Sequence, residues 1–281
     1  NVIDDISADT TMTTMNVSGT EKTTITLGSE TTNLATFSAS GLTDDLTLDA
    51  SSLTSNTTFT GGSREDTFTM GTTLNQNDTV DGGADGTASG ENDLLTATIT
   101  GLTATTGALN ISNVEVIDLT NNGTATINAA GITGADSINI FASSDTTTIT
   151  NLTSGATVGL SKTGGADQVI GDLTVGLADA TGTADVINFG FNEVTSATLA
   201  ASGVETVNFI GSTTDTDIAE AVLTISALNA STISFSGANA DTAHTMGLGT
   251  LDTDTTTLNA TDYRGVLTAQ GSTAATSFSL R

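Results

Sequence analysis

A glycine pair followed by an aspartate is the stretch of this sequence best suited to chemistry. In Thr60-Gly61-Gly62-Ser63-Arg64-Glu65-Asp66-Thr67-Phe68 the aspartate comes four residues after the second glycine, and an apolar residue follows two positions later. Paired glycines permit a tight turn with positive φ. Such a turn directs carbonyl oxygens inward, and a carboxylate adds the hard anionic oxygen that Ca²⁺ prefers. The stretch predicts a calcium site at Gly61, Gly62 and Asp66, with Phe68 entering the core.

A second cluster of glycine-aspartate turns is predicted between residues 75 and 95, as two turns separated by an insertion. The strand pattern resumes at Leu95, at the spacing that the first turn shows. Asp-Gly is also a common turn dipeptide, so a solvated loop is the alternative. The predicted ligands here are Asp78, Asp81, Gly83, Asp85, Asn92 and Asp93.

Shortened versions of the same turn recur further along the chain, each as a turn, an aspartate and then alternating apolar residues. Each aspartate could instead cap its turn by accepting nearby N–H groups. As a set, the turns predict several calcium ions along one repetitive architecture. The predicted ligands in them are Asp136, Gly164, Gly165, Asp167 and Asp185.

Two glutamates precede similar apolar segments, in Val114-Glu115-Val116-Ile117 and in Val204-Glu205-Thr206-Val207. Each glutamate either closes a ligand shell one turn away or is an exposed side chain on a strand, and the sequence leaves both readings open. Because alternate strand residues share a face, Val114, Val116 and, after a register shift, Leu119 are expected in the core.

Short strands must position all of these residues. Apolar residues alternate with threonine or serine, proline is absent, and strong helix formers are scarce. An internal repeat relates Leu48-Asp49-Ala50 to Leu258-Asn259-Ala260 without a gap as far as the next glycine turn. The sequence therefore predicts an all-β protein made of parallel β-solenoid or β-roll-like coils, with strands of about five residues and little helix. Residues 1–47 are expected to be an N-terminal β segment continuous with a repetitive region over 48–281.

The charge balance restricts the partners of the chain. The formal net charge is −27, from 32 acidic and five basic residues among 281. Without a basic patch, nucleic acid and an anionic membrane surface are poor partners. The chain has no cysteine, so metal ions rather than disulfides would stabilise it outside the cell. The sequence contains no run of about 18 apolar residues, so no membrane span is predicted. No secretory signal peptide is visible. Both ends look cut from something longer.

Catalysis has little support in the residue types. His244 is the sole histidine and is expected in a surface loop. A β-helix polysaccharide-active enzyme needs paired carboxylates or bases and aromatic platforms, which five basic residues, one tyrosine and no tryptophan supply poorly. Ice binding is a third class, because Thr96, Thr98 and Thr100 suggest hydroxyl ladders. The threonine pairs do not recur at one fixed period, so threonine is ascribed mainly to strand propensity and solubility.

Short motifs in this chain resemble those of a known family. The segments 163–169 (TGGADQV), 183–189 (TADVINF) and 203–209 (GVETVNF) resemble the repeat domains of calcium-dependent bacterial S-layer proteins, which are relatives of RTX proteins and of large secreted adhesins. The first glycine turn is similar to the G-G-x-G-x-D-x-U-x nonapeptide, with Arg64 at the third glycine. The resemblance implies a β-solenoid or β-roll, calcium at the turns, type I secretion and an extracellular, cell-surface location.

The sequence predicts a structural, non-enzymatic protein that assembles with itself into a calcium-stabilised surface lattice. Cell-surface polysaccharide is a further candidate partner. A calcium-rigidified adhesin stalk is the alternative. The two differ in that a stalk stays monomeric, whereas a lattice protein forms ordered two-dimensional arrays.

Overall fold

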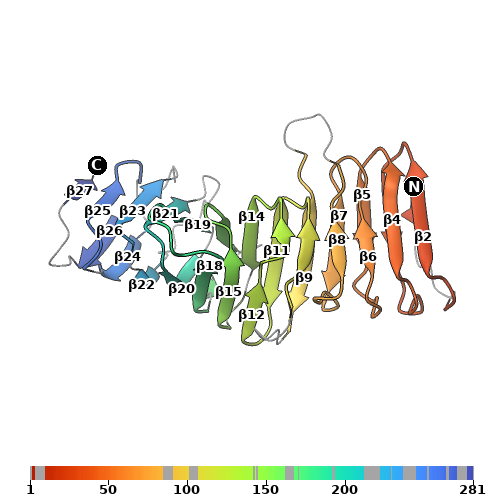
Figure 1. Ribbon diagram of the computed structural model, residues 1–281, viewed down its shortest axis with the longest axis horizontal. Coiled ribbons are helices and arrows are strands. Elements are labelled where there is room, and N and C mark those ends of the chain that lie inside the picture. The colour runs from red at the N-terminus through yellow and green to blue at the C-terminus, as the bar shows by residue number, and fades with distance from the viewer. Residues whose placement is uncertain are drawn as a thin grey trace. The chain divides into compact units, whose positions relative to one another are not determined.

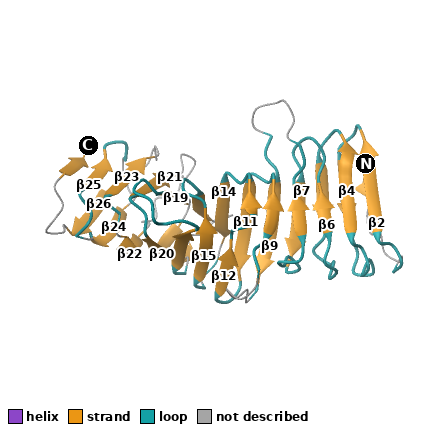
Figure 2. Ribbon diagram, viewed as in Figure 1, coloured by secondary structure: helices purple, strands orange, loops and turns teal. Residues whose placement is uncertain are grey.

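Parallel β-strands form the regular secondary structure of the described chain, which coils as a β-solenoid of about nine turns. This confirms the predicted all-β class, and no helix occurs among the described residues (Figure 2). None of those residues therefore belongs to a helix long and apolar enough to cross a membrane. The computed structural model describes residues 2–3, 10–84, 91–100, 107–141, 143, 145–161, 168–169, 171–191, 194–211, 222–228, 230–236, 245–251, 253–263, 266–270 and 277–280.

The chain divides into two compact units. Unit 1 comprises Asn1–Thr100, Ala104–Thr120 and Asn128–Ile138, and unit 2 comprises Gly101–Thr103, Asn121–Ile127 and Asn139–Arg281. Within unit 1, strands from both sides of residue 47 pair in parallel, as β4 (Thr36–Leu42) does with β6 (Thr58–Thr60).

Unit 1 contains two parallel sheets whose strands alternate along the chain (Figure 1). The strands of unit 1 that belong to the first sheet, in order, are β1 (Val2–Ile3), β3 (Thr23–Thr26), β5 (Leu46–Asp49), β7 (Thr67–Gly71), β9 (Leu94–Ile99) and β11 (Val116–Asn121). Strands of the second sheet, in order, are β13 (Ile132–Thr133), β10 (Asn110–Ser112), β8 (Thr79–Asp81), β6 (Thr58–Thr60), β4 (Thr36–Leu42) and β2 (Thr14–Gly19).

Strict alternation along each strand builds the core of unit 1. In β7 the side chains of Phe68 and Met70 are buried, as predicted for Phe68, while Thr67 and Thr69 are half-exposed. Parallel register stacks like on like, so Phe37 of β4 lies beside Phe59 of β6 with ring centroids 6.3 Å apart. Each turn thus adds one apolar layer to the core.

Unit 2 is built in the same way. Its first set of parallel strands comprises β14 (Ser137–Phe141), which has two residues in unit 1, β16 (Thr157–Ser161), β19 (Val186–Phe191), β21 (Thr206–Gly211), β23 (Thr232–Ser236), β25 (Thr257–Ala260) and β27 (Ser277–Leu280). Its other strands are β12 (Ala125–Asn128), β15 (Thr147–Leu152), β18 (Leu173–Leu177), β20 (Val194–Ser202), β17 (Gln168–Val169) and β22 (Val222–Leu228) in one sheet, and the pair β24 (Thr245–Thr250) and β26 (Val266–Gln270).

Side-chain ladders run across the turns of unit 2. Phe189, Phe209 and Phe235 stack inside the core with successive centroid distances of 5.7 and 4.9 Å. On the outer side, Asn208 donates its side-chain N–H to Oδ1 of Asn188 at 2.9 Å, and Ser234 donates its hydroxyl to Oδ1 of Asn208. The parallel register therefore stabilises unit 2 in two ways, through stacked rings in the core and through side-chain hydrogen bonds on the outer side.

The internal repeat has a structural cause. Ala50, Ala129 and Ala260 are all buried at or directly after the end of a strand, where the chain bends into the next turn. Val114 and Leu119 are buried as expected, but the expectation for Val116 is wrong, because this side chain is half-exposed while Ile117 is buried. Val114 belongs to the preceding turn, so the alternation of β11 begins afresh after Glu115.

Candidate functional site

Acidic residues gather at one corner of the solenoid turns. In unit 1 an acid stands directly before β5, β7, β9, β11 and β14, and in unit 2 directly before β19 and β21. We call this set the acidic corner. It comprises Asp45, Asp66, Asp93, Glu115, Asp136, Asp185 and Glu205.

Carboxylates of the acidic corner reach back to the preceding turn. The N–H of Leu46 donates to Oδ1 of Asp66 at 2.8 Å, the N–H of Asp66 to Oδ1 of Asp93 at 2.7 Å, and the N–H of Asp93 to Oε2 of Glu115 at 2.8 Å. Each such bond satisfies a backbone donor that strand pairing leaves at the corner. Because a carboxylate accepts the bond, it is stronger than a neutral one. We call this chain of bonds the carboxylate ladder.

The ladder recurs in unit 2, where the N–H of Asp185 donates to Oε2 of Glu205 at 2.9 Å. Glu115 and Glu205 therefore accept hydrogen bonds from residues one turn away, which is the position that the ligand-shell interpretation gave them. Their partners are backbone N–H groups, however, and the predicted role as metal ligands stays untested.

The glycine turn encloses Asp66. Its Oδ2 accepts the N–H of Gly62, so the carboxylate bonds to two different turns. A Cβ on Gly61 would strike this Oδ2 and the carbonyl oxygen of Gly82 in the next turn. Neither Gly61 nor Gly62 has positive φ, which corrects the expected reason for the glycine pair. Close stacking of turns, rather than backbone twist, requires glycine here.

The next turn repeats this packing. A Cβ on Gly82 would strike the carbonyl oxygen of Asn113 and Oδ2 of Asp93. Gly83 does adopt a positive φ of 115°, and its N–H donates to Oδ1 of Asp81 at 3.2 Å. The same Asp81 oxygen accepts a side-chain N–H of Asn113 at 2.8 Å. Stacked glycine turns thus hold the carboxylates in place from one turn to the next.

Burial raises the pKa of two acids in unit 1, Asp66 and Asp78. It raises the pKa of Asp66 from 3.8 to about 6, although the hydrogen bonds from Gly62 and Leu46 lower it and the charge of Asp45 raises it further. Burial likewise raises the pKa of Asp78, against bonds from the N–H groups of Thr57 and Asn75. Asp78 lies directly before β8, and its Oδ1 accepts the N–H of Thr57 at 2.9 Å.

The contribution of Asp66 to stability is expected to fall as pH rises from about 4 to about 6. Because its folded pKa is about 6 against 3.8, the folded protein retains a proton that the unfolded chain releases in this window. Asp66 therefore contributes a negative slope of unfolding free energy against pH, and urea unfolding at several pH values should show a less negative slope for Asp66→Asn than for wild type. Asp179→Asn is the control, because hydrogen bonds from Thr181 lower the pKa of Asp179 from 3.8, so its contribution changes with the opposite sign and below this window. An identical pH slope for Asp66→Asn and wild type in this window would refute the assignment.

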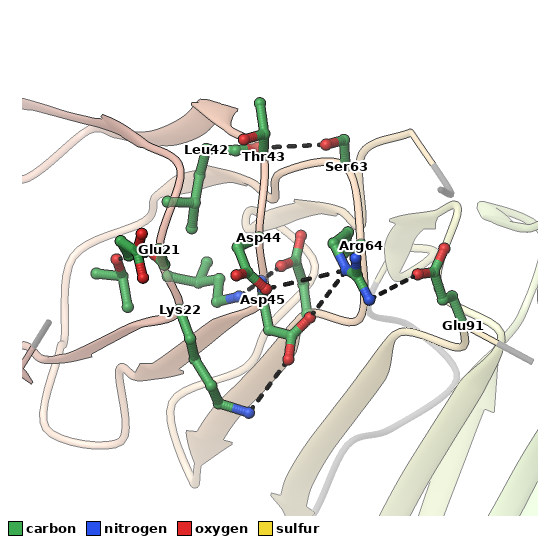
Figure 3. A network of polar contacts seen from close by, with 12 residues as sticks. Glu21, Lys22, Leu42, Thr43, Asp44, Asp45, Ser63, Arg64 and Glu91 are labelled. Carbon is green, nitrogen blue, oxygen red and sulfur yellow. Dashed lines mark hydrogen bonds and ion pairs between the residues drawn. The ribbon is translucent and has the colours of Figure 1, made fainter. Parts of the chain in front are cut away.

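The cationic side chain of Arg64 lies among the carboxylates, two residues before Asp66. Arg64 pairs through Nη2 with Oε1 of Glu91 at 3.1 Å and through Nε with Oδ1 of Asp45 at 3.5 Å (Figure 3). A longer contact of 3.9 Å joins Nε to Asp44, and Lys22 pairs with Oδ2 of Asp45 at 3.2 Å. Both basic residues that the structure describes thus converge on one group of acids.

The pair with Glu91 is the one that matters energetically. The Glu91 side chain is only 8% exposed, whereas Arg64 is half-exposed. Exposed ion pairs contribute about 0–1 kcal/mol each, but a buried carboxylate without a counter-ion is costly. Oε2 of Glu91 is moreover buried without a hydrogen-bond partner. Arg64 therefore serves mainly to hold the Glu91 carboxylate in place.

The structure brings together only part of the predicted calcium set. Gly61, Gly62 and Asp66 lie together as expected, and Asp93 follows one turn later. Asn92 and Asp136 are exposed, and Asp185 is half-buried with one buried oxygen that lacks a hydrogen-bond partner. The predicted residues that lie outside the described part are Asp85, Gly164, Gly165 and Asp167, and His244 lies outside it too.

Among the described residues, no group of three or more histidine, aspartate, glutamate or cysteine side chains is arranged to hold a metal. At the first glycine turn both carboxylate oxygens of Asp66 accept backbone N–H groups. Calcium ligands are oxygens in shells of six to eight, so the described geometry of this turn does not fit the ion. Calcium binding stays a prediction for the chain as a whole.

Sequence reasoning missed the ladder itself and the role of Gly82. The signal for the ladder was present, because an acid directly precedes an alternating segment in Asp45-Leu46, Asp93-Leu94 and Glu115-Val116. The ion pairs of Arg64 had no such signal, since they join residues from three separate turns. Comparison with protein-family models, with curated proteins and with solved structures found no match for this chain.

Proposed function

We propose that the protein is a structural, non-enzymatic component of an extracellular surface layer, and that it assembles with itself into a lattice stabilised by calcium. The observation that carries the proposal is the carboxylate ladder. Its acids hold successive turns together through backbone N–H groups and do not converge on a reacting centre in the described part. A repetitive scaffold of this kind supplies stiffness and repeating surfaces, which a surface layer needs.

The negative charge of the chain is the reason for proposing calcium. A net charge of −27 repels itself in a folded chain, and more strongly between chains in a lattice. The two described basic residues compensate only one group of acids. Extracellular calcium, at about 10⁻³ M, is in the range that extracellular protein sites match. Each ion bound at 100 times its Kd would add about 2.7 kcal/mol to the folded state.

Adding about 1 mM CaCl₂ to the metal-free protein is expected to raise its Tm and to produce ordered two-dimensional arrays. Negative-stain electron microscopy and light scattering report the arrays, and excess chelator should dissolve them. Mg²⁺ should substitute poorly, because it demands a tighter octahedral geometry.

The outcomes separate the candidate functions. A protein that gains thermal stability with calcium yet stays monomeric would be a rigidified adhesin stalk. Unchanged Tm and unchanged particle size in calcium and in chelator would refute the calcium-stabilised lattice.

A further inference from the structure

The outward face of the second sheet of unit 1 carries two unbroken columns of small polar side chains. Parallel register stacks the first column along β2, β4, β6, β8 and β10, and the second along the same strands and β13. We call these two columns the hydroxyl face. It comprises Thr14, Thr36, Thr58, Thr79 and Asn110, and Asn16, Ser38, Thr60, Asp81, Ser112 and Thr133.

We propose that the hydroxyl face docks onto the same face of a second copy of this chain. The inference rests on the proposed function, because it names the surface through which copies would assemble. Between the two columns, Phe37, Phe59, Val80 and Ile111 are buried in the core and unavailable for such a contact, whereas Met15 and Ile132 on the end strands are half-exposed. Over β4, β6, β8 and β10 the contact is therefore polar and is made by the columns alone.

Charge favours a second copy at this face. The chain carries a net charge of −27, so two copies repel wherever their acids meet. On the hydroxyl face the single acid is Asp81, and its Oδ1 already accepts N–H groups from Asn113 and Gly83. Both basic residues of the described part, Lys22 and Arg64, pair with acids elsewhere. The hydroxyl face therefore has no positive charge among its described residues that would attract an acidic partner.

Spacing favours a second copy as well. Neighbouring strands of a sheet are about 4.8 Å apart, so each column repeats at that distance over five or six turns. A second copy has the same repeat by construction, and every turn can then make the same contact. Threonine hydroxyls both donate and accept hydrogen bonds, so a threonine column can pair with another threonine column. Their β-branched side chains are stiff at χ1, which keeps the entropic cost of ordering small.

A two-fold axis is the simplest way to bring one surface onto itself. Placed near β6, in the interior of the sheet, such an axis sets Thr58 close to Thr58 of the second copy. Thr58 is exposed and is flanked in register by Thr36 and Thr79. A charge introduced at this position would therefore face the same charge across the contact.

The test compares charge variants at Thr58 with a matched control. Thr47 of β5 lies on the first sheet, flanked in register by Thr24 and Thr67, so Thr47→Asp adds the same charge to an equivalent ladder. Association is measured by sedimentation velocity in the calcium buffer in which the wild type assembles. Circular dichroism and Tm verify that each variant is folded.

Thr58→Asp and Thr58→Lys are each expected to weaken self-association at least tenfold, whereas Thr47→Asp behaves as wild type. An equimolar mixture of Thr58→Asp and Thr58→Lys should restore association, because opposite charges then meet across the axis. High NaCl should leave the wild-type contact intact, since it screens the repulsion between copies.

Several results would overturn the inference. If the wild type assembles and Thr58→Asp assembles equally well, the hydroxyl face is not the contact, while the proposed function stands. Failure of the mixture to restore association would exclude a self-contact at Thr58. Retention of wild-type protein on ice or on insoluble polysaccharide, lost in Thr58→Asp without any change in self-association, would assign the face to a different partner. A wild type that never assembles would refute the proposed function itself.

Discussion

Gly82→Ala is expected to cost unit 1 about 3 kcal/mol of unfolding free energy, at the upper end of overpacking effects. An added Cβ would strike the backbone carbonyl of Asn113 in the next turn and the carboxylate of Asp93. A backbone atom cannot rotate away as a flexible side chain can, so the turns must separate. Separation would also lengthen the bond from the N–H of Gly82 to the carbonyl of Ser112, now 2.9 Å.

Urea unfolding followed by circular dichroism measures this loss. Gly176→Ala in β18 is the matched control, because a Cβ there would meet no atom within 4 Å. Alanine in a strand loses less conformational freedom on folding than glycine, so this variant should be neutral or stabilised by up to about 1 kcal/mol. Equal stabilities for the two variants would show that turn stacking does not restrict Gly82.

Phe209→Ala is expected to cost unit 2 about 3–5 kcal/mol, which is the range for emptying a phenylalanine site in a core. Phe209 is fully buried and stacks on both neighbours, with its centroid 5.7 Å from Phe189 and 4.9 Å from Phe235. Its removal breaks the aromatic column in the middle, and each lost aromatic pair adds about 0.5–1.5 kcal/mol beyond buried area.

The adjacent residue supplies the control for this prediction. Ile210 lies in the same strand but is 40% exposed, so Ile210→Ala should change stability by less than about 0.5 kcal/mol. Both variants are compared by urea unfolding at one pH. A loss below about 1 kcal/mol for Phe209→Ala would mean that the stacked rings are not part of the cooperative core.

Local patterns in the sequence predict the fold well, because the fold depends on neighbours along the chain. Alternation places Phe68 in the core, and the Leu-Asp-Ala repeat marks the bend where Ala50 is buried. The alternation of buried and exposed residues does not continue through a turn between strands. For that reason Val116 is half-exposed while Ile117 is buried. The alternation itself was correct, but its starting residue depends on the length of the preceding corner.

The candidate site is harder to predict, because its contacts join different turns. The spacing within the first glycine turn predicts that Asp66 lies beside Gly62, and it does. The same spacing does not reveal that Asp93 from the next turn accepts the N–H of Asp66, or that Glu91 pairs with Arg64. Those partners depend on the number of residues in each turn, and insertions make that number irregular.

The carboxylate ladder also gives the solenoid a chemical direction. Every rung takes its donor from an earlier turn and its acceptor from a later one, as with Asp66 and Asp93. When the chain is synthesised from its N-terminus, the N–H at each corner has no carboxylate acceptor until the acid of the next turn has been added. A solenoid cut between two turns likewise exposes a donor on one broken end and an acceptor on the other. Two such ends complement each other only head to tail, so the corner acts as a one-way coupling between turns.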